Sequence, residues 1–315
     1  MTTAVLLCNL GSPAHLTQRD IRAFLRAFLS DPRVIELPAW AWKPLLYGLV
    51  LPYRPRKLLP QYRAIWQKGS PLLLHSVRIQ TQLQTQLGEA YTVFLGMRYG
   101  KPSLEDALDQ IHTLAPTKLI VLPLYPQYAS STTGSTLEKI YSILGRWRAM
   151  PTLVAQADYA SHPPYIDALV QSIQQAFQQQ GRPQRLLFSY HGLPLRQIEQ
   201  GDPYAARCHR TSALIAEQLS LRAEEWQTVF QSRFGKAQWL TPYCQSTLQQ
   251  LPGEGITQVH VVCPGFATDC LETLYEIAEE NKKIFMKAGG RIYHYIPALN
   301  DTDTHIHSLT ALCTA

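Results

Sequence analysis

The chain has 315 residues, of which 46% are hydrophobic, and a formal net charge of +6. This length and composition predict an ordered globular protein with room for two domains, and they exclude a disordered or fibrous class. No apolar stretch reaches the roughly 18 to 20 residues of a membrane span, and the segment MTTAVLLCNLGSP lacks the basic region and cleavage site of a signal peptide. We therefore expect a cytoplasmic protein.

Short apolar runs alternate with longer amphipathic stretches along the chain. The expected strands of the first half are AVLLCNLG, YTVFLGMRYG and KLIVLPLYP, and the proline-rich residues 150–164 are the expected hinge. The expected strands of the second half are RLLFSYHG, AQWLTP, QVHVVCPGF and RIYHYIPA, followed by a terminal helix. Continuous apolar strands separated by helices are typical of parallel sheets covered on both faces, and ligands gather at the carboxyl ends of such strands.

The first 63 residues carry the basic excess, with nine Lys or Arg against three acidic residues. Such a face is typical of a solvated helix, or of a surface that meets nucleic acid, anionic lipid or a polyanionic small molecule. Residues 37–57, LPAWAWKPLLYGLVLPYRPRK, are apolar, aromatic and interrupted by prolines. They form either a buried helix or an apolar flap that rests on a bilayer surface or over a hydrophobic ligand.

The six cysteines contain no C-x-x-C pair and no metal-finger spacing. We therefore expect reduced, mostly buried thiols and no disulfide framework.

His191 follows an apolar run and precedes the turn Gly192-Leu193-Pro194. This position predicts an imidazole held at a strand end, where it either has a structural role or accepts a proton or binds a metal ion.

Three glutamates at spacings of four, Glu272, Glu276 and Glu280, line one face of an expected helix that Asp269 caps. For Glu276 and Glu280, a solvated surface helix explains the spacing as well as a functional row of carboxylates does. Glu272 lies in the first turn, close to the strand end. Carboxylate and imidazole together suit divalent iron, manganese or zinc.

Arg98 and Tyr99 close another expected strand, where the arginine can clamp a ligand carboxylate with two parallel hydrogen bonds. The hydroxyl-rich loop YPQYASSTTGST, residues 125–136, is typical of an anion cradle before a helix, although it lacks the Gly-Lys-Ser/Thr of a nucleotide loop.

These segments closely resemble ferrochelatases of the proteobacterial type. The resemblance covers nearly the whole chain through LLCNLGSP, QYRAIWQKGSPL, GMRYGKPSLEDAL, LPLYPQYASSTTGS, FSYHGLP, FQSRFGKAQWLTP and DCLETLYEI. It implies an α/β fold of two similar Rossmann-like, chelatase-type domains, each a four-stranded parallel sheet flanked by helices, with a porphyrin cleft between them. It also implies domains over residues 1–155 and 156–298, and a terminal helix over residues 299–315 that packs back on the body.

The resemblance assigns roles to individual positions of this sequence. It makes His191 and Glu272 the catalytic and metal-binding pair. It places Asp269, Glu276 and Glu280 on a proton or metal path. The implied porphyrin-binding residues are Arg98, Tyr99, Tyr62, Ser70 and Arg54.

Two departures from the family pattern carry information. Ser130 stands where animal relatives have an internal cluster-binding cysteine, and Cys313 is the last cysteine, so no iron–sulfur cluster and no permanently bound cofactor are expected. Cys270 replaces the histidine of many relatives, which leaves a metal role at that position open.

The implied activity is insertion of Fe²⁺ into protoporphyrin IX with release of two protons, the final step of heme biosynthesis. The alternatives are a coproporphyrin III ferrochelatase and a non-catalytic heme or metal carrier. The expected partners are protoporphyrin IX and Fe²⁺, with peripheral contact to the inner membrane surface, no nucleic acid, and a monomeric state.

Overall fold

The computed structural model describes residues 2–233, 235 and 237–314. Phe234 and Lys236, within the motif FQSRFGKAQWLTP, lie outside the described residues. The chain divides into two compact units. Unit 1 comprises the chain up to Tyr125, Ala129–Ala157 and the chain from Leu309 onward, and unit 2 comprises Pro126–Tyr128 and Asp158–Ser308.

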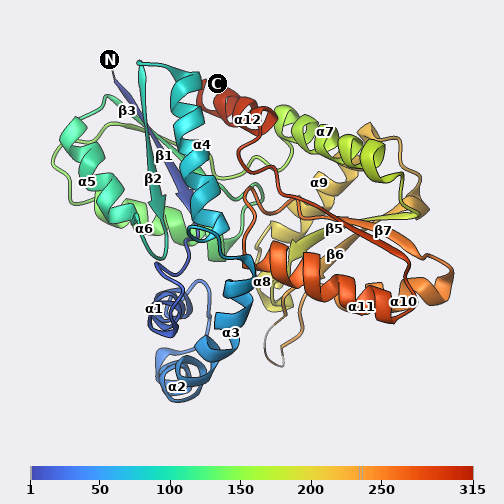
Figure 1. Ribbon diagram of the computed structural model, residues 1–315. Coiled ribbons are helices and arrows are strands. Elements are labelled where there is room, and N and C mark those ends of the chain that lie inside the picture. The colour runs from blue at the N-terminus through green and yellow to red at the C-terminus, as the bar shows by residue number, and fades with distance from the viewer. Residues whose placement is uncertain (1, 234, 236, 315) are drawn as a thin grey trace. The chain divides into compact units, whose positions relative to one another are not determined.

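Unit 1 contains a four-stranded parallel sheet in the order β2-β1-β3-β4. Its strands are β1 (Thr3–Asn9), β2 (Tyr91–Met97), β3 (Lys118–Pro123) and β4 (Thr152–Ala155). Its helices are α1 (Gln18–Leu29), α2 (Ala39–Leu45), α3 (Leu51–Ile65), α4 (Pro71–Leu87), α5 (Leu104–Leu114) and α6 (Ser135–Leu144), with π-helical turns η1 (Leu46–Val50) and η2 (Ser130–Gly134) (Figure 1).

Unit 2 repeats this topology with the sheet order β6-β5-β7-β8. Its strands are β5 (Arg185–His191), β6 (Trp226–Gln231), β7 (Gln258–Val262) and β8 (Ile292–Ile296). Its helices are α7 (Pro163–Gln180), α8 (Leu195–Glu199), α9 (Tyr204–Gln218), α10 (Cys244–Gln250) and α11 (Lys282–Lys287), with the 3₁₀ turns η3 (Ala223–Glu225) and η4 (Leu251–Glu254) and the π-helix η5 (Glu272–Asn281). The last helix, α12 (Asp303–Thr314), begins in unit 2 and ends in the segment grouped with unit 1. Two four-stranded parallel sheets with flanking helices confirm the predicted fold class.

Alternation of side chains along the strands builds the cores. In unit 1, Ala4, Leu6 and Cys8 of β1 point to one face, where they pack against Leu104 and Ile111 of α5 in a cluster that also includes α6. A capping box formed by Ser103 and Asp106 starts α5. In unit 2 the corresponding cluster joins alternate residues of β7 to α10, η5 and α11. All six cysteines are buried and unpaired, which confirms the predicted reduced thiols.

One expectation for the middle of the chain is wrong. The segment AQWLTP is not a strand: Trp239 pairs with Pro194 in an isolated bridge, and the strand at this position in the sheet is β6, which pairs along its length with β5. The expected hinge, residues 150–164, contains the boundary between the two units after Ala157, but its residues Thr152–Ala155 also pair with β3 as the edge strand β4. Proline at position 242 cannot donate to a strand ladder, which disfavours the first segment.

The segment 37–57 forms the helical lip α2-η1-α3, and the structure decides between its two predicted forms. Trp42, Leu46 and Leu51 face inward, and the Trp42 Nε1 donates to the Leu29 carbonyl at 2.7 Å. On the outer side Trp40 is 82% exposed and Tyr53 is 59% exposed. The segment is therefore an exposed apolar flap rather than a buried helix. No helix in the described part of the chain is both long and apolar enough to cross a bilayer.

Candidate functional site

One edge of the unit 2 sheet collects the predicted metal and proton residues. β5 and β7 are neighbouring parallel strands, so their carboxyl ends lie at the same edge of the sheet. β5 ends at His191, and the π-helix that follows β7 begins at Glu272. His191 thus lies at this edge, and Glu272 begins the helix that follows the loop after β7.

A hydrogen bond of His191 places a proton on Nδ1. Its Nδ1 lies 2.7 Å from the Gly192 carbonyl oxygen. A carbonyl only accepts, so Nδ1 carries a proton, and in the neutral form of the ring the lone pair is then on Nε2. The half-buried ring therefore offers Nε2 to a proton or a metal ion.

Gly192 is required for this arrangement. Its N–H donates to the Gln231 carbonyl at 2.7 Å, which ties the turn after β5 to the end of β6. A Cβ at this position would lie 2.9 Å from that same carbonyl oxygen, closer than side chains pack. The glycine of the motif FSYHGLP thus permits the close approach that fixes the histidine.

The glutamate row stands on a π-helix, not on the α-helix that the spacing predicts. Bonding from each residue to the fifth along widens the turn, so residues four apart still lie nearly above one another. Glu272, Glu276 and Glu280 are all partly exposed. π-helical segments occur frequently at functional sites, because they displace side chains from regular α-helical positions.

Ser232 holds the middle glutamate. It follows β6 with a left-handed φ of 63°, and its hydroxyl donates to the Glu276 carboxylate. A non-glycine residue in this region is uncommon and costs conformational energy. The hydrogen bond to Glu276 joins the end of β6 to η5.

Asp269 does not cap the helix, contrary to the prediction. It is 4% exposed, and its carboxylate accepts hydrogen bonds from Thr273 Oγ1 at 2.8 Å, Tyr295 OH at 2.6 Å and Asn300 Nδ2 at 2.7 Å. Its own N–H donates to Asn300 Oδ1 at 2.8 Å. These contacts tie the loop that precedes Glu272 to β8 and to the segment before α12. They favour a role in holding the loop over one in carrying protons or metal.

Cys270 lies two residues before Glu272, just ahead of η5. Burial, followed by the negative charge and hydrogen bonding of Glu272, raises the pKa of the Cys270 thiol well above its ordinary value. With no metal ion beside it, the Cys270 side chain is therefore a neutral thiol near pH 7.

His305 of α12 binds the same residue, Asn300, that holds Asp269. It is fully buried, and its Nδ1 donates to the Asn300 carbonyl at 2.5 Å. Burial lowers the pKa of His305 to about 4, although the bond to Asn300 and the charge of Asp301 act in the opposite direction. In the unfolded chain the imidazole titrates near its ordinary value of about 6.5.

His305 therefore makes the protein less stable in acid. The folded-state pKa is depressed, so the unfolded chain binds the proton first, and stability present above about pH 6.5 is lost as the pH falls toward 4. We expect His305→Gln to reduce the loss of unfolding free energy between pH 7 and 5 by about 2 kcal/mol. Urea titrations at both pH values measure this. His307→Gln, two residues along and exposed, is the matched control, and equal pH dependence in the two variants would contradict the prediction.

The predicted porphyrin residues all lie in unit 1. Arg98 and Tyr99 extend β2 through backbone bonds to Asn9 and Leu10, each 2.8 Å long. Gly11 makes this possible, because it has a φ of 99° and a Cβ there would overlap the Tyr99 carbonyl.

The other three porphyrin candidates lie on α3 and at the start of α4. Tyr62 is buried on α3 and Arg54 is half-buried on the same helix. Ser70 is the N-cap of α4, and its Oγ accepts from the Leu73 N–H at 3.4 Å.

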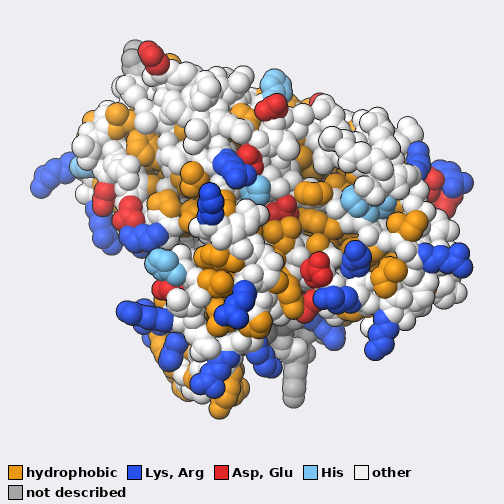
Figure 2. Space-filling view, viewed as in Figure 1, with side chains coloured by type: hydrophobic (Ala, Val, Ile, Leu, Met, Phe, Trp, Pro, Cys, Tyr) orange, Lys and Arg blue, Asp and Glu red, His pale blue; other side chains and the backbone are white. Residues whose placement is uncertain are grey.

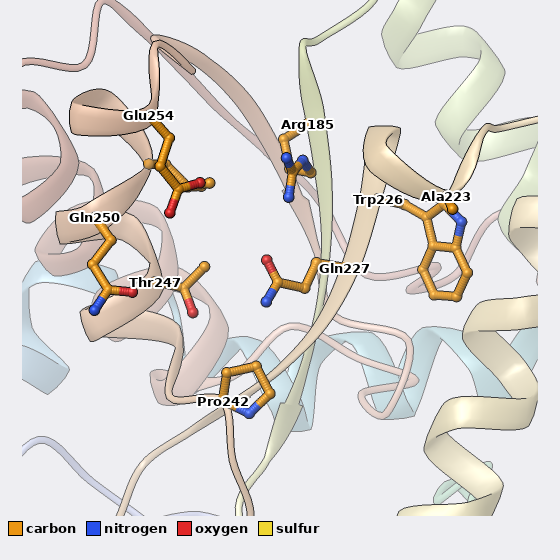
Figure 3. Close-up of a pocket in the computed structure, with 9 residues that line it drawn as sticks. Arg185, Ala223, Trp226, Gln227, Pro242, Thr247, Gln250 and Glu254 are labelled. Atoms are coloured by element: carbon orange, nitrogen blue, oxygen red, sulfur yellow. The ribbon is translucent and has the colours of Figure 1, made fainter.

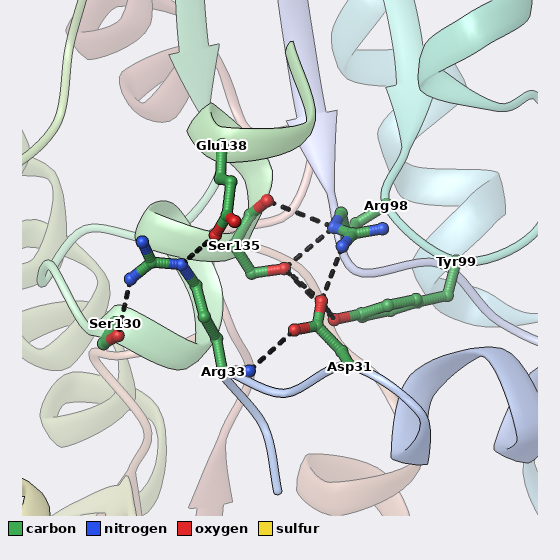
Figure 4. Close-up of polar contacts among 7 residues, drawn as sticks. All are labelled: Asp31, Arg33, Arg98, Tyr99, Ser130, Ser135 and Glu138. Carbon is green, nitrogen blue, oxygen red and sulfur yellow. Dashed lines mark hydrogen bonds and ion pairs between the residues drawn. The ribbon is translucent and has the colours of Figure 1, made fainter. Parts of the chain in front are cut away.

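The hydroxyl-rich loop that predicted an anion cradle already holds an anion. Ser135, which opens α6 at the end of this loop, donates to the Asp31 carboxylate at 2.6 Å, and Arg98 and Tyr99 bind the same carboxylate (Figure 4). Asp31 was not among the residues predicted from the sequence. No local pattern marks it, because its side-chain partners lie 67 to 104 positions away.

A polar pocket of about 400 Å³ in unit 2 contains none of the predicted residues (Figure 3). Arg185 and Trp226, which line it, are the first residues of β5 and β6. The pocket therefore lies at the amino ends of the strands, away from the edge that carries His191. Among the described residues, no three His, Cys, Asp or Glu side chains form a group that could hold a metal ion.

The fold defines the class of protein first. The chain is similar to SirB from Bacillus subtilis with Fe³⁺, at 14% identity and a TM-score of 0.56 over 100% of this chain and 95% of that one. It is also similar to CbiX, described as the terminal enzyme for biosynthesis of siroheme in denitrifying bacteria, at 16% identity and a TM-score of 0.53 over 99% of each chain. At these identities the likeness shows a shared chelatase-type fold.

Sequence comparison then gives the family. The ferrochelatase family model matches residues 2–315. Ferrochelatase of Nitrosococcus oceani is 47% identical over 98% of this chain and 85% of its own length, and ferrochelatase 2 of Shewanella oneidensis is 48% identical over 98% and 95%. The chain belongs to the ferrochelatase family. The predicted metal-inserting lyase of heme biosynthesis is confirmed, and the carrier and coproporphyrin alternatives are not favoured.

Proposed function

We propose that His191 and Glu272 carry out the central chemistry as the protein inserts Fe²⁺ into protoporphyrin IX and releases two protons. The observation that supports this most directly is the Nδ1–H bond of His191 to the Gly192 carbonyl, which makes Nε2 the nitrogen that the neutral ring offers at the edge of the sheet. Glu272 begins the helix that follows the neighbouring strand β7. Imidazole nitrogen and carboxylate oxygen both bind divalent iron.

Iron insertion is slow without help because two pyrrole N–H groups occupy the centre of the ring and the ion must shed its water. A protein accelerates it by holding the ring bent, removing the pyrrole protons and delivering a partly desolvated ion. His191 takes up pyrrole protons, binds the incoming iron, or does each in turn, and Glu272 takes the complementary part. Glu276 and Glu280 continue the carboxylate row along η5 toward solvent and carry protons or metal.

The family resemblance also supports five porphyrin contacts, which we propose are Arg98, Tyr99, Tyr62, Ser70 and Arg54. We further propose that the chain works without a permanently bound cofactor. Ser130 offers a hydroxyl, bonded to Arg33 Nη1 at 3.0 Å, where an internal cluster ligand would stand. Iron and acid-labile sulfide assays of the purified protein should find neither.

An anaerobic absorbance assay tests the proposed function. Mixing the protein with Fe²⁺ and excess protoporphyrin IX should convert many porphyrin molecules to heme for each protein molecule, and faster than with coproporphyrin III. A carrier would show at most one equivalent of heme. Preference for coproporphyrin would overturn the assignment of substrate.

We propose that the lip α2-η1-α3 docks on an anionic membrane surface. Trp40, Tyr47, Leu49 and Tyr53 are each about half to four-fifths exposed, and the exposed Lys43 and Lys57 lie on the same segment. Figure 2 shows hydrophobic and basic side chains together over α2 and α3. Aromatic rings beside cations suit the headgroup region, where each basic residue adds about 1 kcal/mol of attraction.

Sedimentation with liposomes tests this docking. At low salt the protein should sediment with vesicles containing anionic lipid, and less with neutral vesicles or at high salt, because surface charges are then screened. Trp40→Ala should lower the bound fraction several-fold, since it removes the largest exposed apolar group of the lip. Met150→Ala, an exposed apolar residue outside the lip, is the control. Equal binding of both variants would contradict the proposal.

A further inference from the structure

A buried carboxylate organises the end of β2. Asp31 is 6% exposed and stands in the linker between α1 and α2. Its Oδ2 accepts from Arg98 Nη2 at 2.5 Å, Tyr99 OH at 2.7 Å and Ser135 Oγ at 2.6 Å, and its Oδ1 accepts from the Arg33 N–H at 2.8 Å (Figure 4). Asp31 therefore accepts four hydrogen bonds, more than a carboxylate in an exposed surface ion pair accepts from its single partner.

These contacts keep Asp31 charged. Burial alone would raise its pKa, but the hydrogen bonds from Ser135, Tyr99 and the Arg33 backbone, together with the charge of Arg98, outweigh burial and lower the pKa below its ordinary value. Because a carboxylate only accepts, the Tyr99 hydroxyl points its proton at Asp31.

The same contacts fix the orientation of Arg98. Its Nε donates to Ser135 Oγ at 2.8 Å and its Nη2 donates to Asp31, so one edge of the guanidinium is fully used inside the protein. The group also stacks over the Tyr99 ring at 4.7 Å. The Nε–H and one N–H of Nη2 are committed to Ser135 and Asp31, so the two-bond carboxylate clamp predicted from the sequence would use the other end of the group, Nη1 and the second N–H of Nη2.

The linker is fastened at a second point. Arg33, two residues after Asp31, forms an ion pair with Glu138 of α6 and donates to Ser130 Oγ at 3.0 Å. The linker that leads into the lip is thus tied at two points. Asp31 binds Arg98 at the end of β2, and Arg33 binds Glu138 of α6.

We infer that Asp31 is a positioning residue, which holds Arg98 and Tyr99 in the orientation that meets the carboxylate groups of the porphyrin. This inference rests on the proposed function, since it takes Arg98 and Tyr99 as porphyrin contacts. Asp31 acts through its two partners and does not itself touch the substrate.

Comparing two forms of one porphyrin isolates this role. Binding of protoporphyrin IX and of its dimethyl ester to the whole protein is measured by fluorescence quenching, and the ratio of the two dissociation constants reports recognition of the carboxylates. We expect Asp31→Asn to reduce the preference for the diacid by about tenfold, because a charge-assisted hydrogen-bond network is lost. A purely structural defect would weaken both ligands equally.

A second variant tests the same network if Asp31→Asn folds poorly, and a third serves as the control. Ser135→Ala removes one donor that holds Asp31 and Arg98 and should reduce the preference by about threefold. Asp109→Asn makes the same chemical change on the exposed face of α5 and should leave the ratio unchanged.

The outcomes separate this inference from the proposed function. If the wild-type protein inserts iron and prefers the diacid, yet Asp31→Asn and Ser135→Ala keep that preference, positioning by Asp31 is refuted and the proposed function stands. A stronger preference in Asp31→Asn would show that the aspartate neutralises the arginine instead of positioning it. Failure of the wild type to insert iron would remove the proposed function itself.

Discussion

His191→Ala should abolish iron insertion while the protein still binds porphyrin. The variant removes the imidazole at the end of β5, whose Nδ1 is bonded to the Gly192 carbonyl and whose Nε2 is the nitrogen that can bind a proton or a metal ion. Loss of a general acid or base costs about 10² to 10⁴ in rate, and loss of a metal ligand adds to this. Steady-state rates from the anaerobic assay measure the effect, and fluorescence quenching measures porphyrin affinity.

The control for this variant is His15→Ala. His15 lies in an exposed loop of unit 1 with its side chain 78% exposed, so the same truncation there should leave the rate unchanged. Near-normal turnover of His191→Ala would remove this histidine from the centre of the mechanism. Loss of porphyrin affinity in parallel with rate would point instead to a role in binding the ring.

Glu272→Gln should lower the rate by about 10²-fold, since the change keeps the size of the side chain and removes its charge. The rate constants also assign the role of the group. A rise in the KM for Fe²⁺ identifies a metal ligand, because the amide binds the ion more weakly than the carboxylate. A fall in kcat at unchanged KM identifies a proton acceptor.

The rest of the carboxylate row should show a graded effect. Glu276→Gln should slow the reaction less than Glu272→Gln, and Glu280→Gln should slow it least, because each lies one turn further along η5. Glu279→Gln is the matched control on the same helix, since Glu279 is exposed and paired with Lys283. Equal activity of all four variants would contradict any role for this face of η5.

The sequence predicts the sheets well because a buried parallel strand leaves a local signal. A continuous apolar run such as LIVLP of β3, followed by an amphipathic stretch, identifies a βα unit without knowledge of any distant residue. The segment AQWLTP misled this reading because it is short and apolar, while β6 carries polar residues in its first half. Short runs of this kind are ambiguous, because pairing with a neighbouring strand decides their structure.

The predicted site depended on the same local signals. His191 is found because it follows a strand, and Glu272 because it opens the next helix along the edge. The π-helical turn of η5 was not predictable, since the spacing of four suits α-helix and π-helix alike. The state of Asp269 was not predictable either, because its partners Tyr295 and Asn300 come from segments 26 and 31 residues away.

The amino-acid sequence by itself determined the class of fold, the family and the strand ends that carry the candidate residues, because periodicity and motifs are properties of neighbouring positions. Only the tertiary structure decided which side chains are already occupied. Asp31 binds Arg98, Tyr99 and the Ser135 hydroxyl at the end of the expected anion cradle, whereas His191 uses Nδ1 to bind the Gly192 carbonyl. Hydrogen bonds between residues far apart in the chain exist only once packing has brought their elements together, and no local pattern encodes them.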